Sequence, residues 1–212
     1  MELREDIALR LLQINAIKLN PQNPFTWASG IQSPIYCDNR LILSYPDQRK
    51  FIISAFADLA GQFQPFDAIS GVATAGIAHG ALLAQEMDLP FSYVRSKPKG
   101  HGRQNQIEGK IESGQRILVI EDLISTGGSA IAAVEALREA GTEVVGTMAI
   151  FQYNFELARM RFDEINCDFA TLSDYKSLIS AARSQEMFTE SEFALLDAWY
   201  TNPKEWSPAK SA

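Results

Sequence analysis

Apolar and polar positions alternate along this chain with two different periods. Segments in which apolar residues recur every three or four positions predict helices at residues 1–18, 46–61, 77–87 and 130–138. Short apolar runs predict buried strands at residues 67–70, 91–94, 117–120 and 143–151. A β-like region, residues 25–39, follows a break rich in proline and asparagine. The order is therefore mainly one of strands alternating with helices.

That order predicts an α/β fold, a doubly wound and mainly parallel sheet flanked by helices. The chain has 212 residues, no internal repeat and no linker, so we expect a single domain spanning residues 1–212. In such a sheet, ligands bind at the carboxyl ends of the strands. Residues 156–212 read as short helical and β-like pieces and indicate little about function.

The most informative segment is residues 117–130, an apolar run followed by Glu121, Asp122 and a turn rich in glycine and hydroxyl groups. Such a turn before a helix binds anions, because free N–H groups and the helix dipole point into it. The acidic pair would repel a bare phosphate, so the pattern favours a ligand with phosphate and hydroxyls, such as a sugar phosphate. No lysine follows Gly127–Gly128, which excludes a P-loop. A generic turn with Ser129 capping the helix is the alternative.

Composition narrows the class of protein. Net charge is −7, which argues against nucleic acid as a partner. The chain lacks an apolar run of the ~20 residues that a membrane helix needs, so no membrane partner is expected. Its acidic start lacks the apolar region of a signal peptide, and the two cysteines, Cys37 and Cys167, form no C-x-x-C pair. We expect a cytoplasmic protein.

A polar loop at residues 95–112 concentrates positive charge in this acidic chain. It carries His101 and five of the 19 lysine and arginine residues, namely Arg95, Lys97, Lys99, Arg103 and Lys110. Most such loops are solvated surface loops. Next to the phosphate segment, however, the loop is typical of a lid whose cations bind a pyrophosphate leaving group.

These segments carry a family resemblance that spans residues 25–151. Residues 117–130 resemble the signature for 5-phosphoribosyl 1-diphosphate (PRPP) of type I phosphoribosyltransferases. In the basic loop, Arg95, Lys99, His101 and Gly102 match the R-x-x-x-K-x-H-G pattern of orotate phosphoribosyltransferases. Residues 25–36 resemble the N-terminal hood of that family, F-x-x-x-S-G-x-x-S-P-x-Y/F. The chain is thus identified as a member of the orotate phosphoribosyltransferase family.

The resemblance implies the type I phosphoribosyltransferase fold, with a small hood at residues 1–45 and a flexible catalytic loop at residues 95–112. It implies a pentosyltransferase that moves the phosphoribosyl group from PRPP to orotate, giving orotidine 5′-monophosphate and pyrophosphate in UMP biosynthesis. It also implies Mg²⁺, held mainly by PRPP and water rather than by protein ligands. The family forms homodimers in which the loop reaches the neighbouring subunit's site.

Residue roles carried over from the family fall into three groups. The catalytic residues implied by the resemblance are Arg95, Lys99, His101 and Asp122. Those implied to bind PRPP are Arg95, Lys99, His101, Glu121, Asp122, Leu123, Ile124, Ser125, Thr126, Gly127, Gly128 and Ser129. Those implied to bind orotate are Ser29, Gly30, Tyr36 and Ser125.

Several positions depart from the family pattern and suggest a distinct sub-branch. Trp27, Ser96, Ala75 and Tyr153 stand where many relatives have lysine, arginine or a Tyr-Lys pair. The hood aromatics Phe25, Trp27 and Tyr36 have core packing as an alternative role. At the level of function, a transferase for a purine base and a PRPP-sensing regulator without catalysis are the alternatives. The hood and lid favour orotate, and the chain has neither the basic charge nor the extra length expected of a DNA-binding regulator.

Overall fold

The computed structural model describes residues 2–27, 30–96 and 106–206. The chain forms two compact units, a larger one of residues 43–175 and a smaller one of residues 1–42 with 176–212. The assignment of residues 1–212 to one domain with a hood at residues 1–45 stays a prediction. Within the larger unit, the described residues form a six-stranded sheet and four α-helices.

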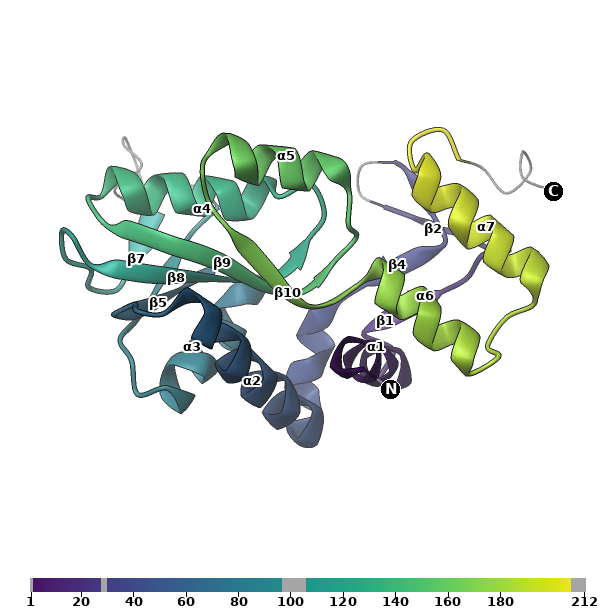
Figure 1. Cartoon of the computed structure of the whole chain (residues 1–212), viewed down its shortest axis with the longest axis horizontal. Helices are drawn as coiled ribbons and strands as arrows, with labels where there is room; N and C mark the ends of the chain where they lie inside the picture. The colour runs from purple at the N-terminus through teal and green to yellow at the C-terminus, as the bar shows by residue number, and fades with distance from the viewer. Residues whose placement is uncertain (1, 28–29, 97–105, 207–212) are drawn as a thin grey trace. The chain divides into compact units, whose positions relative to one another are not determined.

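The sheet of the larger unit is parallel except at one edge (Figure 1). Its strands are β5 (Ala68–Val72), β6 (Phe91–Val94), β7 (Ile107–Glu108), β8 (Arg116–Ile124), β9 (Glu143–Gln152) and β10 (Phe169–Asp174). Their spatial order is β10-β9-β8-β5-β6-β7, and only β7 runs antiparallel to its neighbour in the described part of the chain. The predicted mainly parallel sheet is confirmed.

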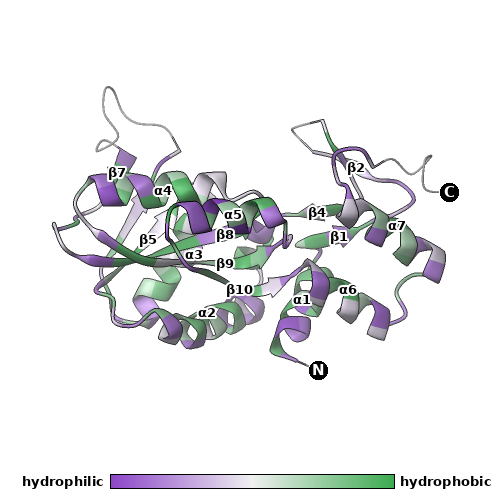
Figure 2. Ribbon diagram, turned by 45° about the horizontal axis from the view of Figure 1, so that its top comes forward, coloured by the Kyte–Doolittle hydropathy of each residue, from purple (hydrophilic) through white to green (hydrophobic). Residues whose placement is uncertain are grey.

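Helices cover both faces of this sheet. They are α2 (Pro46–Ala60), α3 (Ala75–Glu86), α4 (Gly128–Glu139) and α5 (Glu156–Glu164), with a short 3-10 turn, η2 (Gly61–Phe63), after α2. Helices α2 and α3 lie on one face, and α4 and α5 lie on the other (Figure 1). The hydrophobic colour is concentrated on the strands, whereas α2 and α4 carry both colours (Figure 2). The doubly wound arrangement predicted from the sequence is therefore confirmed.

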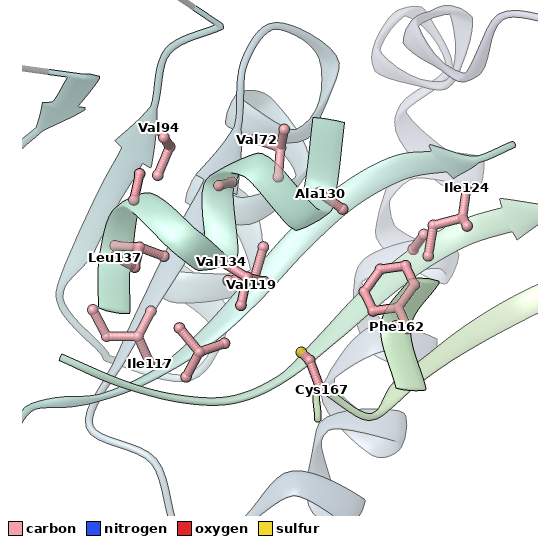
Figure 3. Packing of buried hydrophobic residues seen from close by; sticks show 14 of the residues in the cluster. Val72, Val94, Ile117, Val119, Ile124, Ala130, Val134, Leu137, Phe162 and Cys167 are labelled. Carbon is pink, nitrogen blue, oxygen red and sulfur yellow. The ribbon is translucent and has the colours of Figure 1, made fainter. Parts of the chain in front are cut away.

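The core between α4 and the sheet explains why this part of the sequence folds as it does. Val134 and Leu137, three positions apart on α4, pack in the same buried cluster as Ile117 and Val119 of β8 (Figure 3). All four side chains are fully buried. Each contributes roughly 1.5–3 kcal/mol relative to an exposed position. These contacts fix α4 against β8.

The smaller unit contains short strands and three described α-helices. Its elements are α1 (Leu3–Gln13), β1 (Ile17–Leu19), β2 (Phe25–Thr26), β3 (Gln32–Ser33), β4 (Ile35–Cys37) and α7 (Glu190–Thr201). A 3-10 helix, η1 (Asn39–Ser44), and a helix, α6 (Tyr175–Ser184), span the two boundaries with the larger unit. Strand β1 pairs antiparallel with β4, and β2 pairs antiparallel with β3.

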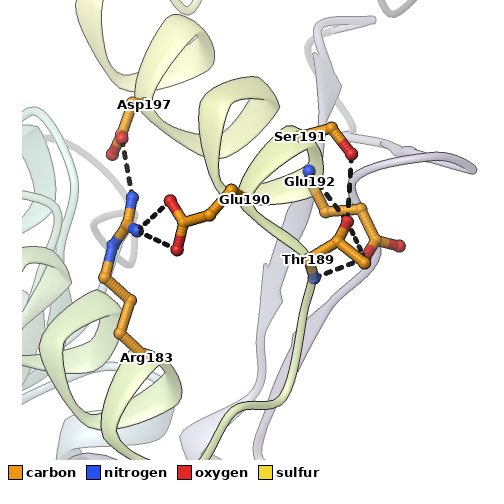
Figure 4. A network of polar contacts seen from close by, with 6 residues as sticks. All are labelled: Arg183, Thr189, Glu190, Ser191, Glu192 and Asp197. Atoms are coloured by element: carbon orange, nitrogen blue, oxygen red, sulfur yellow. Dashed lines mark hydrogen bonds and ion pairs between the residues drawn. The ribbon is translucent and has the colours of Figure 1, made fainter.

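Polar contacts tie α6 to α7 in the smaller unit (Figure 4). Arg183 Nη1 donates to Glu190 Oε2 at 2.8 Å, and Arg183 Nη2 donates to Asp197 Oδ2 at 3.1 Å. The same guanidinium lies 4.2 Å from the centre of the Phe193 ring. Thr189 and Glu192 form a capping box at the start of α7, which satisfies N–H groups left open there.

The predicted first helix is wrong at its C-terminal end. The helix stops at Gln13, and Asn15 adopts a left-handed conformation with φ of 57°. Ile17 and Lys18, which the predicted helix had included, belong to β1 (Ile17–Leu19), because this segment pairs with Ile35–Cys37. Partners about twenty positions away along the chain decide this segment, so local periodicity alone misassigns it.

The order of strands reverses between β5 and β8. From β5 the chain passes through α3 to β6 on one side, and from β8 it passes through α4 to β9 on the other. The loops that follow β5 and β8 therefore leave in opposite directions at the same edge. In open α/β sheets this is the place where ligands bind.

Gly76 allows the start of α3 to lie directly against β8. A Cβ atom at Gly76 would overlap the carbonyl oxygen of Ile120 and would lie 3.2 Å from Cα of Glu121. Both neighbours are backbone atoms of a central strand, so neither can move aside cheaply. The contact brings the loop after β5 next to the acidic end of β8.

Replacing Gly76 by alanine should lower the free energy of unfolding by about 2 kcal/mol, as expected for overpacking. The measurement is urea unfolding followed by circular dichroism. Gly61→Ala is the matched control, because no atom lies within 4 Å of the added Cβ there. The control should change stability by less than about 1 kcal/mol. Equal unfolding midpoints for the two variants would show that the backbone around Gly76 accommodates a Cβ atom and would contradict the prediction.

Candidate functional site

Strand β8 continues past the predicted segment 117–120 and ends at Ile124. It does so because Glu121 and Leu123 pair with Ala149 and Phe151 of β9. The two carboxylates therefore belong to the strand, and the loop begins only at Ser125. The expectation that the strand ends just before Glu121 is corrected by four residues, and the acidic pair is held by sheet hydrogen bonds.

The loop after β8 leads directly into a helix start that suits an anion. Gly127 precedes α4 with φ of 79°, a left-handed conformation that glycine adopts without strain. The first helical hydrogen bond runs from the Ile131 amide to the Gly127 carbonyl at 2.9 Å. The amides at the beginning of α4 thus have no carbonyl one turn earlier, and no acidic residue lies in its first turn.

Two adjoining pockets surround this helix start. One, of about 160 Å³, is lined by Glu121 and residues 123–130. The second, of about 210 Å³, is lined by Val72, Ala73, Val94, Arg95, Ser96, Gln106, Gly128, Ser129, Ala132 and Ala133. Gly128 and Ser129 border both pockets. Most of the residues predicted to bind PRPP are thereby brought to one place in the larger unit.

Arg95 and Lys110 are the cations of the predicted lid that the structure describes, and Arg95 lies beside the second pocket. Its Nη1 lies 3.6 Å from Glu108 Oε1, and its side chain is one-third exposed at 33%. Its backbone amide donates to the Gln106 carbonyl at 2.8 Å, which joins the first residue of the predicted lid to the residue just before β7. Two other predicted lid residues, Lys99 and His101, lie outside the described residues.

Glu121 is an unusual acid because it is only 6% exposed. Its Oε1 accepts a hydrogen bond from the Asp122 amide at 2.9 Å. Burial raises the pKa of the Glu121 carboxyl well above its ordinary value, and the neighbouring Asp122 carboxylate raises that pKa further. Asp122 itself is half-buried. Two acids of different exposure therefore stand side by side at the end of β8, and Glu121 lines the smaller pocket.

The hood residues belong to the smaller unit. Tyr36 is 40% exposed, with its ring centre 5.7 Å from that of Phe25. Gly30 is exposed with φ of 82°, and Ser29 lies outside the described residues. Their assignment to orotate stays a prediction. The exposed Tyr36 ring leaves a flat surface open to stacking.

Two of the positions that depart from the family pattern have packing partners. Trp27 Nε1 donates to the Ile35 carbonyl at 3.1 Å, and its ring meets Trp199 edge-on at 5.8 Å. Tyr153 is buried and stacks on Phe155 at 5.4 Å. Core packing, the alternative raised for Trp27, thus describes its surroundings in the smaller unit.

The donor atoms near the pocket suit a hard cation only in part. Within residues 2–27, 30–96 and 106–206, no group of three or more His, Cys, Asp or Glu side chains is arranged to hold a metal ion. Glu121 and Asp122 supply carboxylate oxygens, which Mg²⁺ prefers. The pair fits a cation that arrives with most of its ligands already in place.

No helix in the described ranges is long and apolar enough to span a membrane.

Two residues lie next to residues 125–127, the loop between β8 and α4, and the sequence did not predict them there. Arg161 Nη1, on α5, donates to the Thr126 carbonyl at 3.1 Å. The buried ring of Phe162 lies under Gly127, because a Cβ added there would be 3.0 Å from Phe162 Cε2. Both residues fall within 156–212, which had been judged uninformative, and no local pattern links them to the loop.

The fold and this pocket agree with what comparison with known proteins finds. The family model described as "Phosphoribosyl transferase domain" matches residues 45–180, which defines the class as phosphoribosyltransferases. An orotate phosphoribosyltransferase of Bacillus mycoides is 52% identical over 202 residues, 95% of this chain and 96% of that protein. The chain therefore belongs to the orotate phosphoribosyltransferase family, and the family resemblance of its motifs is confirmed.

Solved structures give the same fold. The orotate phosphoribosyltransferase of Aeropyrum pernix superposes with a TM-score of 0.74 at 25% identity, covering 86% of this chain and 99% of that one. The UMP synthase of Leishmania donovani superposes with a TM-score of 0.79 at 26% identity over 94% of this chain. This chain spans only 42% of the length of that synthase chain. The type I phosphoribosyltransferase fold is confirmed.

The buried acid predicts a pH-dependent effect of Glu121→Gln on stability. Since the folded-state pKa of Glu121 lies above the ordinary value of 4.5, its contribution to stability is favourable at low pH. That contribution is lost as pH rises through the folded pKa. The glutamine stays neutral, so the variant should gain stability relative to the original protein between pH 5 and pH 8, in urea unfolding.

Glu86→Gln, an exposed glutamate at the end of α3, serves as the control, and its difference from the original protein should not change with pH. A constant difference for Glu121→Gln over the same range would contradict the raised pKa.

Proposed function

We propose that this chain transfers the phosphoribosyl group of PRPP to orotate, giving orotidine 5′-monophosphate and pyrophosphate in UMP biosynthesis. The observation that carries the proposal is the near full-length identity to the Bacillus mycoides orotate phosphoribosyltransferase. The fold alone would not suffice, because one fold serves many substrates. The geometry of the larger unit supports specific roles for its residues.

The 5′-phosphate of PRPP binds at the start of α4 in this proposal. Hydroxyl groups of Ser125, Thr126 and Ser129 and the amides around Gly127 and Gly128 donate to its oxygens. The supporting observations are the pocket of about 160 Å³ and the helix start without acidic residues. A dianionic phosphate is stabilised there by the N–H groups and by the helix dipole.

Glu121 and Asp122 bind the ribose hydroxyls, with Leu123 and Ile124 as the neighbouring pocket wall. In the reaction, N1 of orotate bonds to C1′ of the ribose as the bond from C1′ to the pyrophosphate oxygen breaks. Positive charge develops on the ribose during this step, and the Asp122 carboxylate stabilises it. The half-exposed position of Asp122 supports this role, since the buried Glu121 is harder to ionise.

Arg95, Lys99 and His101 contact the pyrophosphate. Their positive charges and N–H groups offset the negative charge that accumulates on the leaving group, and His101 donates a proton or a hydrogen bond to it. Arg95 borders the pocket that shares Gly128 and Ser129 with the phosphate site, which supports a place for it near PRPP. Closure of the loop over the site excludes water and limits hydrolysis of PRPP.

Mg²⁺ is the proposed cofactor, and it arrives bound mainly to PRPP and water. When bound, it neutralises charge on the diphosphate. Glu121 and Asp122 would offer it carboxylate oxygens, the ligand type that Mg²⁺ prefers, at the end of β8. The pKa of Glu121 is raised by burial first and by the Asp122 carboxylate second, and a cation there would relieve the repulsion between the two acids.

Orotate is proposed to contact Ser125, which lines the phosphate pocket, and the hood residues Ser29, Gly30 and Tyr36. An exposed aromatic ring suits stacking on a pyrimidine. We also propose a cytoplasmic location. Cys37 and Cys167 are not joined in a disulfide, which fits a reducing compartment.

The substrate is tested by incubating the protein with PRPP, Mg²⁺ and one of four bases, orotate, uracil, adenine or hypoxanthine. Pyrophosphate release should occur with orotate and fall at least about a hundredfold with the others, because a site that pairs with polar groups rejects analogues lacking them. Asp122→Asn is the control, because a loss of pyrophosphate release in this variant assigns the activity to this site. Release with adenine instead of orotate would overturn the substrate, and no release with any base would favour the PRPP-sensing regulator.

A homodimer with a shared loop is proposed from the family and is tested by mixing two defective variants. Lys99→Ala and Asp122→Asn should each lower turnover by a factor of about 100 or more. Random mixing of their subunits makes hybrid dimers in which one of the two sites combines an intact Lys99 with an intact Asp122. The mixture should then regain about a quarter of the original activity.

The control is Lys50→Ala, at an exposed lysine on α2, mixed with Asp122→Asn. Lys50→Ala is active before mixing, so the activity of this mixture should not exceed the activity that Lys50→Ala contributes alone. If the loop closes over its own subunit's site, the mixture of Lys99→Ala and Asp122→Asn stays inactive. That result would contradict the shared loop while leaving the transferase assignment in place.

A further inference from the structure

Helix α5 contacts the phosphate loop through two consecutive residues with different chemistry. Arg161 Nη1 donates to the carbonyl oxygen of Thr126 at 3.1 Å. Phe162 is fully buried, and its ring packs on Phe169 with centres 4.4 Å apart. Figure 3 shows Phe162 in the same cluster as Ile124, the last residue of β8. The loop is thus held by a hydrogen bond at Thr126 and by a rigid surface below Gly127.

The hydrogen bond from Arg161 orients one particular peptide group. In a trans peptide, the carbonyl of one residue and the N–H of the next point in opposite directions. With the Thr126 carbonyl directed toward α5, the Gly127 N–H is directed away from α5. The Gly127 carbonyl is occupied as well, because it accepts the first hydrogen bond of α4 from Ile131. Both peptide groups that flank Gly127 are therefore fixed before a ligand arrives.

The ring of Phe162 removes the alternative conformations of Gly127. Glycine with φ of 79° is free to move to other regions in an open loop, and this freedom is costly when a ligand must order it. Here a Cβ would lie 3.0 Å from Phe162 Cε2 and 3.3 Å from Ile131 Cδ1, so the backbone is closely packed on one side. Arg161 supplies the remaining, polar restraint.

We propose that Arg161 is a positioning residue for PRPP: it holds the Thr126 peptide so that the loop amides face the 5′-phosphate. This inference rests on the proposed phosphate site and adds a residue that does not itself touch the ligand. The bond is charge-assisted, since the guanidinium is always protonated, and such bonds are stronger than neutral ones. Arg161 therefore acts from the side of the loop opposite to the proposed phosphate.

The neighbouring Arg159 offers a matched control on the same helix. Its Nη2 lies 3.8 Å from Glu156 Oε1 and its Nη1 lies 3.7 Å from Asp163 Oδ2, and its side chain is 67% exposed. Arg159→Gln therefore removes the same charge from α5 without removing the bond to the loop. A general effect of charge on PRPP binding would be equal for the two arginines, whereas positioning is specific to Arg161.

The experiment measures PRPP binding by titration calorimetry and steady-state kinetics for the original protein, Arg161→Gln, Arg161→Lys and Arg159→Gln. We expect Arg161→Gln to weaken PRPP binding and raise its KM about tenfold, with less than about a twofold change in kcat and in the KM for orotate. Arg161→Lys keeps a charged donor and should recover part of the loss. Arg159→Gln should match the original protein.

Other results would contradict either the positioning role of Arg161 or the proposed function. Equal PRPP affinity for Arg161→Gln and Arg159→Gln overturns the positioning role. So does a parallel loss in kcat, both KM values and melting temperature, because that pattern marks a merely structural residue; Arg161→Lys provides the test if Arg161→Gln does not fold. If the original protein itself binds no PRPP, the proposed function fails instead.

Discussion

The contact between the backbone of Gly76 and the backbone of β8 is the constraint on which the site of the larger unit depends. It places the start of α3 against Ile120 and Glu121, at the strand where the winding of the sheet reverses. A side chain at this point would push the loop after β5 away from the loop after β8. Two loops that belong to opposite faces of the sheet therefore meet at one edge, and the pockets open there.

The electrostatics of this edge select a ligand with two different parts. The start of α4 favours negative charge, while Glu121, which lines the same pocket, and the adjacent Asp122 disfavour it. A bare anion satisfies the first and is repelled by the second. A sugar phosphate satisfies both, because its phosphate and its hydroxyls are separated by the length of the ribose. Burial raises the pKa of the Glu121 carboxyl, so the more exposed Asp122 is the acid that carries its negative charge more readily.

Restraint of the phosphate loop comes from outside the motif that binds. The family pattern covers residues 117–130, and Arg161 and Phe162 lie outside it. In this chain a helix thirty-five positions further on supplies a guanidinium and an aromatic ring to the loop's far side. A loop fixed in this way binds without first losing conformational freedom, which is the general benefit of preorganisation.

The sequence by itself determined the α/β class, the parallel strands, the glycine-rich turn before a helix and the family. These features are local, because an apolar run, an acidic pair and a glycine-rich turn act through neighbours within a few residues. Tertiary structure alone decided three things: that Ile17–Leu19 is a strand and not helix, that β8 extends to Ile124, and that Arg161 reaches Thr126. Each depends on a partner distant in the chain, and periodicity carries no information about distant partners.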